Sequence, residues 1–100
     1  MIAQLRIYTI NRGEMDAWLE IFRGEAIPLI HKHGMGVDGM WTDLARERFI
    51  WFCIYEDEAD MARKDAAFHG DPQWLDLMDR IRAHEAHREI TVVRSILARA

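Results

Sequence analysis

Three side chains that can do chemistry alternate along the first apolar segment of this 100-residue chain, MIAQLRIYTI. Gln4, Arg6 and Tyr8 are two residues apart, and in a β-strand this spacing directs all three to one face of a sheet. A guanidinium is costly to bury unless it is paired. We therefore expect polar partners around Arg6, and two interpretations of the group follow.

In the first interpretation, the three side chains form a structural network with Asp or Glu residues of a second subunit. In the second, Arg6 and Tyr8 bind the carboxylate or phenolate of a small ligand between aromatic walls. Trp41, Trp51 and Tyr55 would supply those walls, His33 would reach the pocket from a helix end, and Arg94 could join either group. The candidate ligand-binding set is Arg6, Tyr8, His33, Trp41, Trp51, Tyr55 and Arg94.

The histidines and the serine do not predict a metal site or a nucleophile. The segment from His84 to His87 reads H-E-A-H, one residue short of the zinc signature H-E-x-x-H and without an obvious third ligand. His31 and His33 are two residues apart and diverge around a helix. Ser95, the only serine, has no nucleophile elbow. We expect no metal and no cofactor, with His84 and His87 as solvated groups near a helix end.

Composition excludes other classes. The formal net charge is -4, without a cluster of Lys or Arg, which argues against nucleic-acid binding because that affinity depends on neutralising phosphates. The N-terminal segment is interrupted by Arg6, so we expect neither a signal peptide nor a membrane span. A single cysteine, Cys53, lies in an apolar run and predicts a buried, inert thiol in a reducing, cytoplasmic setting.

The hydrophobic pattern predicts four strands and two helical regions in one domain, residues 1–100. Residues 2–10 read as a strand, and from Glu14 the apolar period becomes helical. Pro28 falls within that helix, where we expect a kink. The remaining expected elements are strands over 37–43 and 48–55, a helix capped by Asp57 that runs to His69, a second helical piece restarted by Asp71 and Pro72 that fades near His87, and a strand over 89–97 with a short basic end.

This order predicts a ferredoxin-like βαββαβ fold, an α+β class with an antiparallel four-stranded sheet whose first and third strands are central. The third strand holds seven consecutive apolar residues, Phe49 to Tyr55. The helices cover one face of the sheet, and no segment remains for the other. Each large side chain left in water would forgo about 1.5–3 kcal/mol. We therefore expect a homodimer in which two sheets pair into a dimeric α+β barrel.

Several segments together resemble the NIPSNAP family over nearly the whole chain. They are QLRIYTINRGEMDAWLEIF, PLIHKHG, GMW, YED and DPQW, in this order. The resemblance implies a dimeric α+β barrel, shared with small monooxygenases and isomerases that act on aromatic compounds, and it implies little chemistry. Many members have an acid where this chain has Gln4, and that departure weakens an ion-pair role for the polar face of the strand.

Three functional hypotheses follow. The first is a NIPSNAP-like homodimer of unassigned reaction that binds a small, partly apolar or aromatic molecule. The second is a cofactor-independent monooxygenase or isomerase for an aromatic substrate, in which Arg6 and Tyr8 orient an enolate or phenolate and His33 or Tyr55 moves a proton. The third is a non-catalytic interaction module. Only the first two require a cavity with convergent polar groups.

Overall fold

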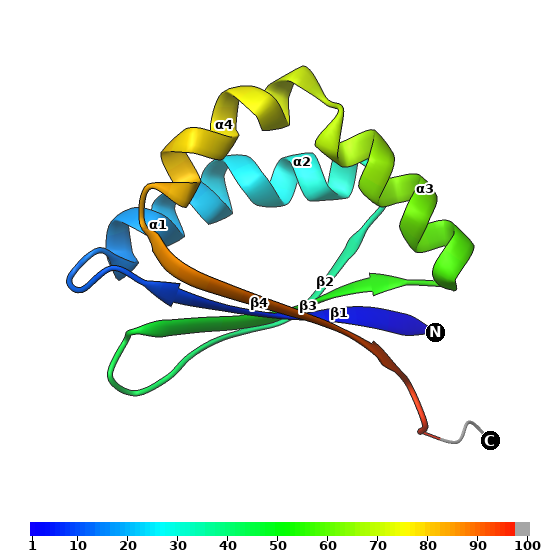
Figure 1. Ribbon diagram of the computed structural model, residues 1–100, viewed down its shortest axis with the longest axis horizontal. Helices are drawn as coiled ribbons and strands as arrows, with labels where there is room; N and C mark the ends of the chain where they lie inside the picture. Colours follow the sequence, from blue (N-terminus) through cyan, green and yellow to red (C-terminus); the bar gives the residue numbers. More distant parts are fainter. Residues whose placement is uncertain (98–100) are drawn as a thin grey trace.

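The computed structural model describes residues 1–97, and it places every helix of that range on one side of a single sheet (Figure 1). The strand order β2-β3-β1-β4 with antiparallel pairing confirms the predicted ferredoxin-like fold. Residues 98–100, the predicted basic end, lie outside the described range. The elements are β1 Ile2–Ile10, α1 Met15–Ile21, the π-helical η1 Phe22–Ala26, α2 Ile27–Lys32, β2 Gly36–Thr42, β3 Arg48–Tyr55, α3 Glu58–His69, α4 Pro72–Arg82 and β4 Glu85–Arg94.

The first helical region continues through Pro28 by means of a π-helical turn. Pro28 has no N–H to donate to the carbonyl of Gly24, and the preceding residues form η1 instead of an α-helical turn. The N–H of Ile27 donates to the carbonyl oxygen of Phe22, five residues back. Such π turns are frequent at functional sites, and this one carries Phe22 and Ala26 over the sheet.

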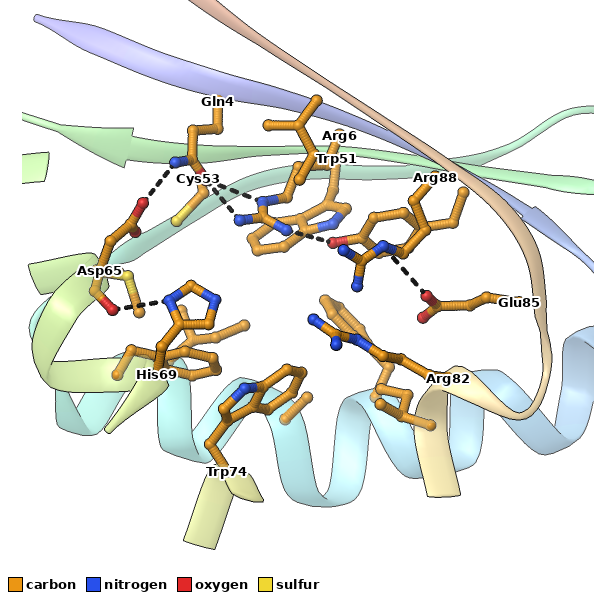
Figure 2. Close-up of a pocket in the computed structure, with 18 of the residues that line it drawn as sticks. Gln4, Arg6, Trp51, Cys53, Asp65, His69, Trp74, Arg82, Glu85 and Arg88 are labelled. Atoms are coloured by element: carbon orange, nitrogen blue, oxygen red, sulfur yellow. Dashed lines mark hydrogen bonds and ion pairs between the residues drawn. The ribbon is translucent and has the colours of Figure 1, made fainter. Parts of the chain in front are cut away.

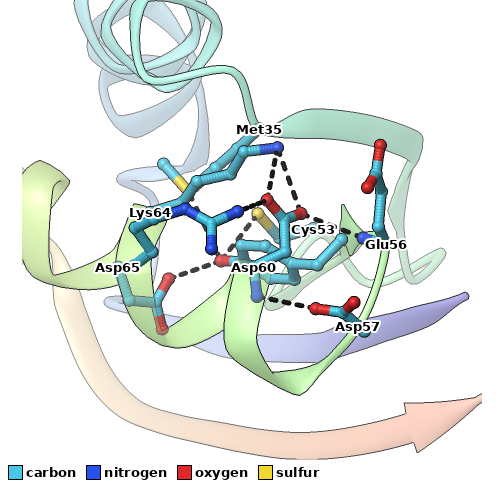
Figure 3. A network of polar contacts seen from close by, with 9 residues as sticks. Met35, Cys53, Glu56, Asp57, Asp60, Lys64 and Asp65 are labelled. Carbon is cyan, nitrogen blue, oxygen red and sulfur yellow. Dashed lines mark hydrogen bonds and ion pairs between the residues drawn. The ribbon is translucent and has the colours of Figure 1, made fainter.

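The predicted cap at Asp57 is confirmed, and it begins a polar network on α3. The Asp57 side chain accepts a hydrogen bond of 2.7 Å from the N–H of Asp60. Asp60 is itself buried, accepts from the N–H of Glu56 and pairs with Arg63 and Lys64 at 3.0 and 3.1 Å (Figure 3). The Glu56 N–H, followed by Lys64, lowers the pKa of Asp60. This network fixes the junction between β3 and α3.

The boundary between α4 and β4 differs from the prediction. The helix ends at Arg82 and not near His87, and the strand spans Glu85–Arg94 and not 89–97. Pairing with β1 explains the earlier start, because the ladder runs from Ile10 opposite Glu85 to Ile2 opposite Arg94. His84 lies in the turn and His87 on the strand, so the expectation that both lie near a helix end was wrong for His87.

The two faces of β3 are used differently. Phe49, Trp51, Cys53 and Tyr55 face the helices and are buried. Trp18, which is fully buried, packs against Phe22 and Phe49 with ring centroids 4.8 and 4.5 Å away. The other face of the sheet, which we call the open face, is covered by nothing within residues 1–97. Its apolar side chains are Ala3, Leu5, Ile7, Trp41, Ile50, Phe52, Ile54 and Val93.

The helices of the described range are all too short or too polar to cross a membrane.

The buried cap of α4 yields a prediction about acid stability. Asp71 accepts from the N–H of Gln73 at 2.8 Å and pairs with Lys32 and His33 at 2.9 and 2.7 Å. Lys32, then His33 and the Gln73 N–H, hold the pKa of Asp71 well below its usual value. A lowered pKa stabilises the fold above the pKa of the unfolded chain, about 4, and that stabilisation is lost as the pH falls.

We therefore expect Asp71→Asn, which keeps a good capping residue, to lower Tm by several degrees at neutral pH. The difference from the wild type should shrink as the pH falls below about 4. Thermal unfolding followed by circular dichroism across this range measures it. Asp79→Asn, an exposed change on the same helix, is the control. A difference that persists into strong acid would contradict the assigned role of the ion pairs.

Candidate functional site

A cavity of about 250 Å³ lies between the helix-covered face of the sheet and the helices (Figure 2). Its walls combine a large apolar surface with polar groups from β1, β3, β4, α3 and α4. The apolar lining consists of Phe22, Ala26, Ile30, Met35, Trp51, Phe68, Trp74, Ile81 and Ile90. The polar lining consists of Gln4, Arg6, Tyr8, Cys53, Tyr55, Asp65, His69, Arg82, Glu85 and Arg88.

Four of the seven residues proposed from the sequence meet in this cavity. Arg6 and Tyr8 come from β1, and Trp51 and Tyr55 come from the neighbouring strand β3. Arg6 pairs directly with Trp51 in the sheet register. Alternation along two adjacent strands was therefore enough to bring these four side chains together.

The other three lie elsewhere. His33 binds Asp71 at 2.7 Å, and Arg94 lies at the exposed end of β4, where it pairs with Glu58 at 3.4 Å. Trp41 is 64% exposed, on the open face opposite Ile50. A bulge explains its position. The β2 register shifts between Asp38 and Met40 at Gly39, which has a φ of 68°, and one extra residue moves the following side chains to the opposite face.

Arg6 is held by neutral groups. Its Nε and Nη2 donate to Gln4 Oε1 at 2.9 and 2.7 Å, and its Nη1 donates to Tyr8 Oη at 3.0 Å. The guanidinium lies 5.7 Å from the ring centroid of Trp51, a favourable cation–π position. Burial raises the pKa of Tyr8 although Arg6 opposes the shift. Tyr8 is therefore a neutral phenol whose oxygen accepts from Arg6 and whose proton is free to be donated.

A second network closes one end of the cavity around Asp65 of α3. Gln4 Nε2 donates to Asp65 Oδ2 at 2.7 Å, and Tyr55 Oη donates to Asp65 Oδ1 at 2.5 Å. Cys53 Sγ donates to Tyr55 Oη at 3.2 Å. Burial, followed by the bond to Asp65, raises the pKa of Tyr55, and burial raises the pKa of Cys53. Cys53 is thus a buried thiol, as predicted, and the Tyr55 proton is directed to Asp65.

At the opposite end of the cavity, where α4 turns into β4, the polar side chains have fewer hydrogen-bond partners. Glu85 accepts from Trp18 Nε1 at 3.0 Å, and Arg88 Nε lies 3.8 Å from Glu85 Oε1. The Arg82 guanidinium stacks over Trp74 with its Cζ 5.6 Å from the ring centroid. Burial raises the pKa of Glu85 although Trp18 opposes the shift.

Among residues 1–97, three buried side-chain polar atoms have no hydrogen-bond partner, and all three belong to residues that line this cavity. They are Trp51 Nε1, Arg82 Nε and Glu85 Oε1. Buried polar atoms are nearly always hydrogen-bonded, so each exception needs an explanation such as a bound molecule. Three residues of the cavity wall therefore carry polar atoms that the protein itself does not satisfy.

His69 supplies a proton acceptor at the cavity wall. Its Nδ1 lies 2.8 Å from the backbone carbonyl oxygen of Asp65, so Nδ1 carries the proton and donates it. In the neutral imidazole the lone pair is then on Nε2, and the ring nitrogen without the hydrogen bond points toward the cavity in Figure 2. The ring packs edge-on against Phe68 and Trp74 at 5.4 and 6.1 Å.

Several of these residues were missed by sequence reasoning, although two signals pointed to them. Asp65 and His69 are four residues apart and therefore share a face of α3 with Phe68. Arg88 and Ile90 alternate on β4 beside Tyr8 and Arg6. The predicted strand begins at residue 89, so it does not include Arg88. The missed lining residues that carry polar atoms are Asp65, His69, Trp74, Arg82, Glu85 and Arg88.

Comparisons with known proteins agree with this architecture. The family model described as NIPSNAP matches residues 3–97. The crystal structure of an uncharacterized NIPSNAP domain protein from Burkholderia xenovorans is similar to this chain with a TM-score of 0.87 and 24% identity, covering 100% of both chains. A NIPSNAP family protein with unknown function from Agrobacterium tumefaciens has a TM-score of 0.86 and 21% identity, covering 93% of this chain and 86% of its own.

A more distant likeness reaches a cofactor-independent oxygenase from Streptomyces nogalater. Its TM-score is 0.74 at 13% identity, with 97% of this chain and 94% of the oxygenase covered. At these identities the solved structures show a shared fold. No protein with a curated description matches the sequence.

Proposed function

The chain belongs to the NIPSNAP family, and we propose that it is a homodimeric barrel protein that binds a small, partly apolar or aromatic molecule in its cavity. One observation carries the proposal. The three unpaired buried polar atoms all belong to residues around a single cavity with aromatic walls. An unsatisfied buried polar group costs about 1–3 kcal/mol, so the wall of this cavity departs from what stability alone would favour, as functional sites do. The buried Cys53 thiol fits a reducing, cytoplasmic setting.

The cavity also discriminates between the hypotheses. A pure interaction module has no need of a hollow core, whereas ligand sites combine apolar walls with a few convergent polar groups. Phe68, Trp74 and Trp51 supply such walls, and Arg6 and Tyr8 supply such polar groups. We therefore favour a binding role over a module that acts through its exterior.

The binding role can be tested by filling the cavity. Ala26 lies on η1, is buried and lines the cavity, so Ala26→Leu places extra side-chain volume inside it. With 2-naphthamide as a neutral aromatic probe, we expect wild-type binding in isothermal titration calorimetry and quenching of Trp fluorescence. Ala26→Leu should weaken this binding at least about tenfold, or 1.4 kcal/mol.

Ala17→Leu makes the same change at an exposed position of the preceding helix α1 and should bind like the wild type. Circular dichroism of both variants checks that they fold. Equal binding by the wild type and Ala26→Leu would place the probe outside the cavity, and no wild-type binding at millimolar probe would count against the proposal.

The open face supports the homodimer. Ile50, Phe52 and Ile54 of β3 are only half-buried, and Trp41 lies beside them and is largely exposed. A contiguous apolar patch of this kind is typical of a protein interface. A second copy of the same sheet, related by a two-fold axis, would bury the patch on both subunits with one interaction surface.

Charges placed at two neighbouring positions of β3 should separate the two faces. Phe52→Glu puts a carboxylate on the open face, so we expect a folded monomer where the wild type is a dimer of twice 11.8 kDa. Trp51→Glu puts the carboxylate among the buried aromatic rings and should unfold the subunit, because an unpaired buried charge costs several kcal/mol. Sedimentation and circular dichroism distinguish these outcomes, and a concentration-independent wild-type monomer would exclude the barrel.

A second candidate function, proton transfer on an aromatic substrate without a cofactor, is favoured by His69. Its Nε2 holds the lone pair at the cavity wall, whereas His33 is bound to Asp71 and the Tyr55 proton is directed to Asp65. A base at His69 would take a proton from an acidic carbon or hydroxyl. Arg6 and Tyr8 would then donate to the resulting enolate or phenolate oxygen.

Deuterium exchange tests this candidate directly. In deuterated buffer, the protein should accelerate the exchange of the acidic C–H protons of 2-tetralone, measured by proton NMR, relative to buffer alone. We expect His69→Gln to lose the acceleration and His84→Gln, whose histidine contacts Glu14 outside the cavity, to keep it. Exchange no faster than in buffer would contradict the catalytic hypothesis and would not affect the proposed binding role.

A further inference from the structure

We propose that the cavity contains an anion subsite at the junction of α4 and β4, where Arg82 binds the acid group of an aromatic ligand. The inference rests on the proposed binding function and goes beyond it, because it names the ligand class and the end of the cavity that receives the charged group. The ligand class is an aromatic carboxylate, whose flat body packs along Trp74 and Trp51.

Arg82 is positioned for this role by its place at the end of α4. Its guanidinium lies over Trp74 and is directed into the cavity in Figure 2. Within residues 1–97 it has neither a hydrogen bond nor an ion pair, and its buried Nε has no acceptor. A guanidinium presents two parallel N–H groups that match a carboxylate. An acid group of the ligand would supply the acceptors that Arg82 lacks.

The charges around the cavity favour an anion although the whole chain is acidic. The chain has a formal net charge of -4, but the cavity lining holds three arginines against two carboxylates. Asp65 is already engaged by Gln4 and Tyr55 at the other end. Around the α4–β4 junction, Arg82 and Arg88 face the single carboxylate of Glu85, so one positive charge remains uncompensated.

Glu85 is the one group that would repel an acid here, and its surroundings reduce that repulsion. One oxygen accepts from Trp18, and the other lies near Arg88 at 3.8 Å. Burial raises the pKa of this carboxyl, which favours its neutral form relative to an exposed Glu.

The opposite end of the cavity makes a poorer anion site. N–H groups of Arg6 already donate to Gln4 and Tyr8. Gln4 in turn donates to the Asp65 carboxylate. An acid placed there would approach Asp65. The ligand would therefore point its charged group toward Arg82 and its apolar body toward Phe68 and Trp74.

Paired probes of equal shape test the subsite. Isothermal titration calorimetry at low salt would compare 2-naphthoate with 2-naphthamide, which differ in charge and not in ring system. We expect the wild type to bind the acid at least about tenfold more tightly than the amide. Arg82→Gln should remove this preference by weakening acid binding more than amide binding, and Arg82→Lys should keep part of it.

Two further variants sharpen the result. Arg80→Gln removes a positive charge two residues away on α4, where Arg80 pairs with Glu25 outside the cavity, and should preserve the preference. Glu85→Gln removes the competing anion, retains an acceptor for Trp18 and should tighten acid binding. Circular dichroism confirms that each variant folds.

The outcomes separate the two proposals. Wild-type binding of the amide with no preference for the acid would overturn the anion subsite and leave the binding function standing. An unchanged preference for the acid in Arg82→Gln would also overturn the anion subsite. Weaker binding of the acid by Glu85→Gln than by the wild type would do the same. Failure of the wild type to bind either probe would overturn the binding function and the subsite together.

Discussion

The guanidinium of Arg6 is the constraint on which the site depends. It projects from a central strand toward the helices, where an unpaired charge would cost several kcal/mol. The protein satisfies it with Gln4, Tyr8 and the ring of Trp51, and these polar groups in turn require Asp65 of α3. This network occupies the middle of the sheet. The helices pack through the aromatic cluster around Trp18, which also contacts Tyr8 of β1, and the cavity lies beside that cluster.

The third strand resolves a second constraint, which is that its seven apolar residues must be covered on both sides. Trp51 and Tyr55 pack into the subunit, while Ile50, Phe52 and Ile54 lie on the open face. In the proposed homodimer, such a strand would serve both the subunit core and the interface with one short segment. The Gly39 bulge adds Trp41 to the open face, because a regular register would have placed that ring opposite Phe49 among the helices. One extra residue thus transfers a large aromatic side chain from the core to the exposed patch.

Much of the fold could be predicted because local chemistry and global topology agree in this chain. The bounds of β1 and β3 follow from alternation, and Asp57 and Asp71 mark helix starts because their carboxylates accept from backbone N–H groups of the first turn. Four site residues followed from the same alternation. His33, Trp41 and Arg94 lie outside the cavity. Their positions depend on an ion pair at a helix end, a bulge and the end of the sheet, in that order, and tertiary contacts determine all three features. Asp65 and His69 required knowledge of which face of α3 meets the sheet, and no sequence period specifies the partner of a helix face.

The largest error of the sequence-based prediction coincides with the least satisfied part of the structure. The residues around the α4–β4 turn were predicted as the end of the helix, but the ladder with β1 draws Glu85 and Arg88 into a strand. This places Glu85 beside Trp18 and both arginines near one carboxylate. A segment selected for stability alone would pair these charges or replace them with apolar groups. Natural proteins depart from such local rules mainly at functional sites. The mismatch between propensity and structure here is therefore an independent reason to locate ligand recognition at the α4–β4 end of the cavity.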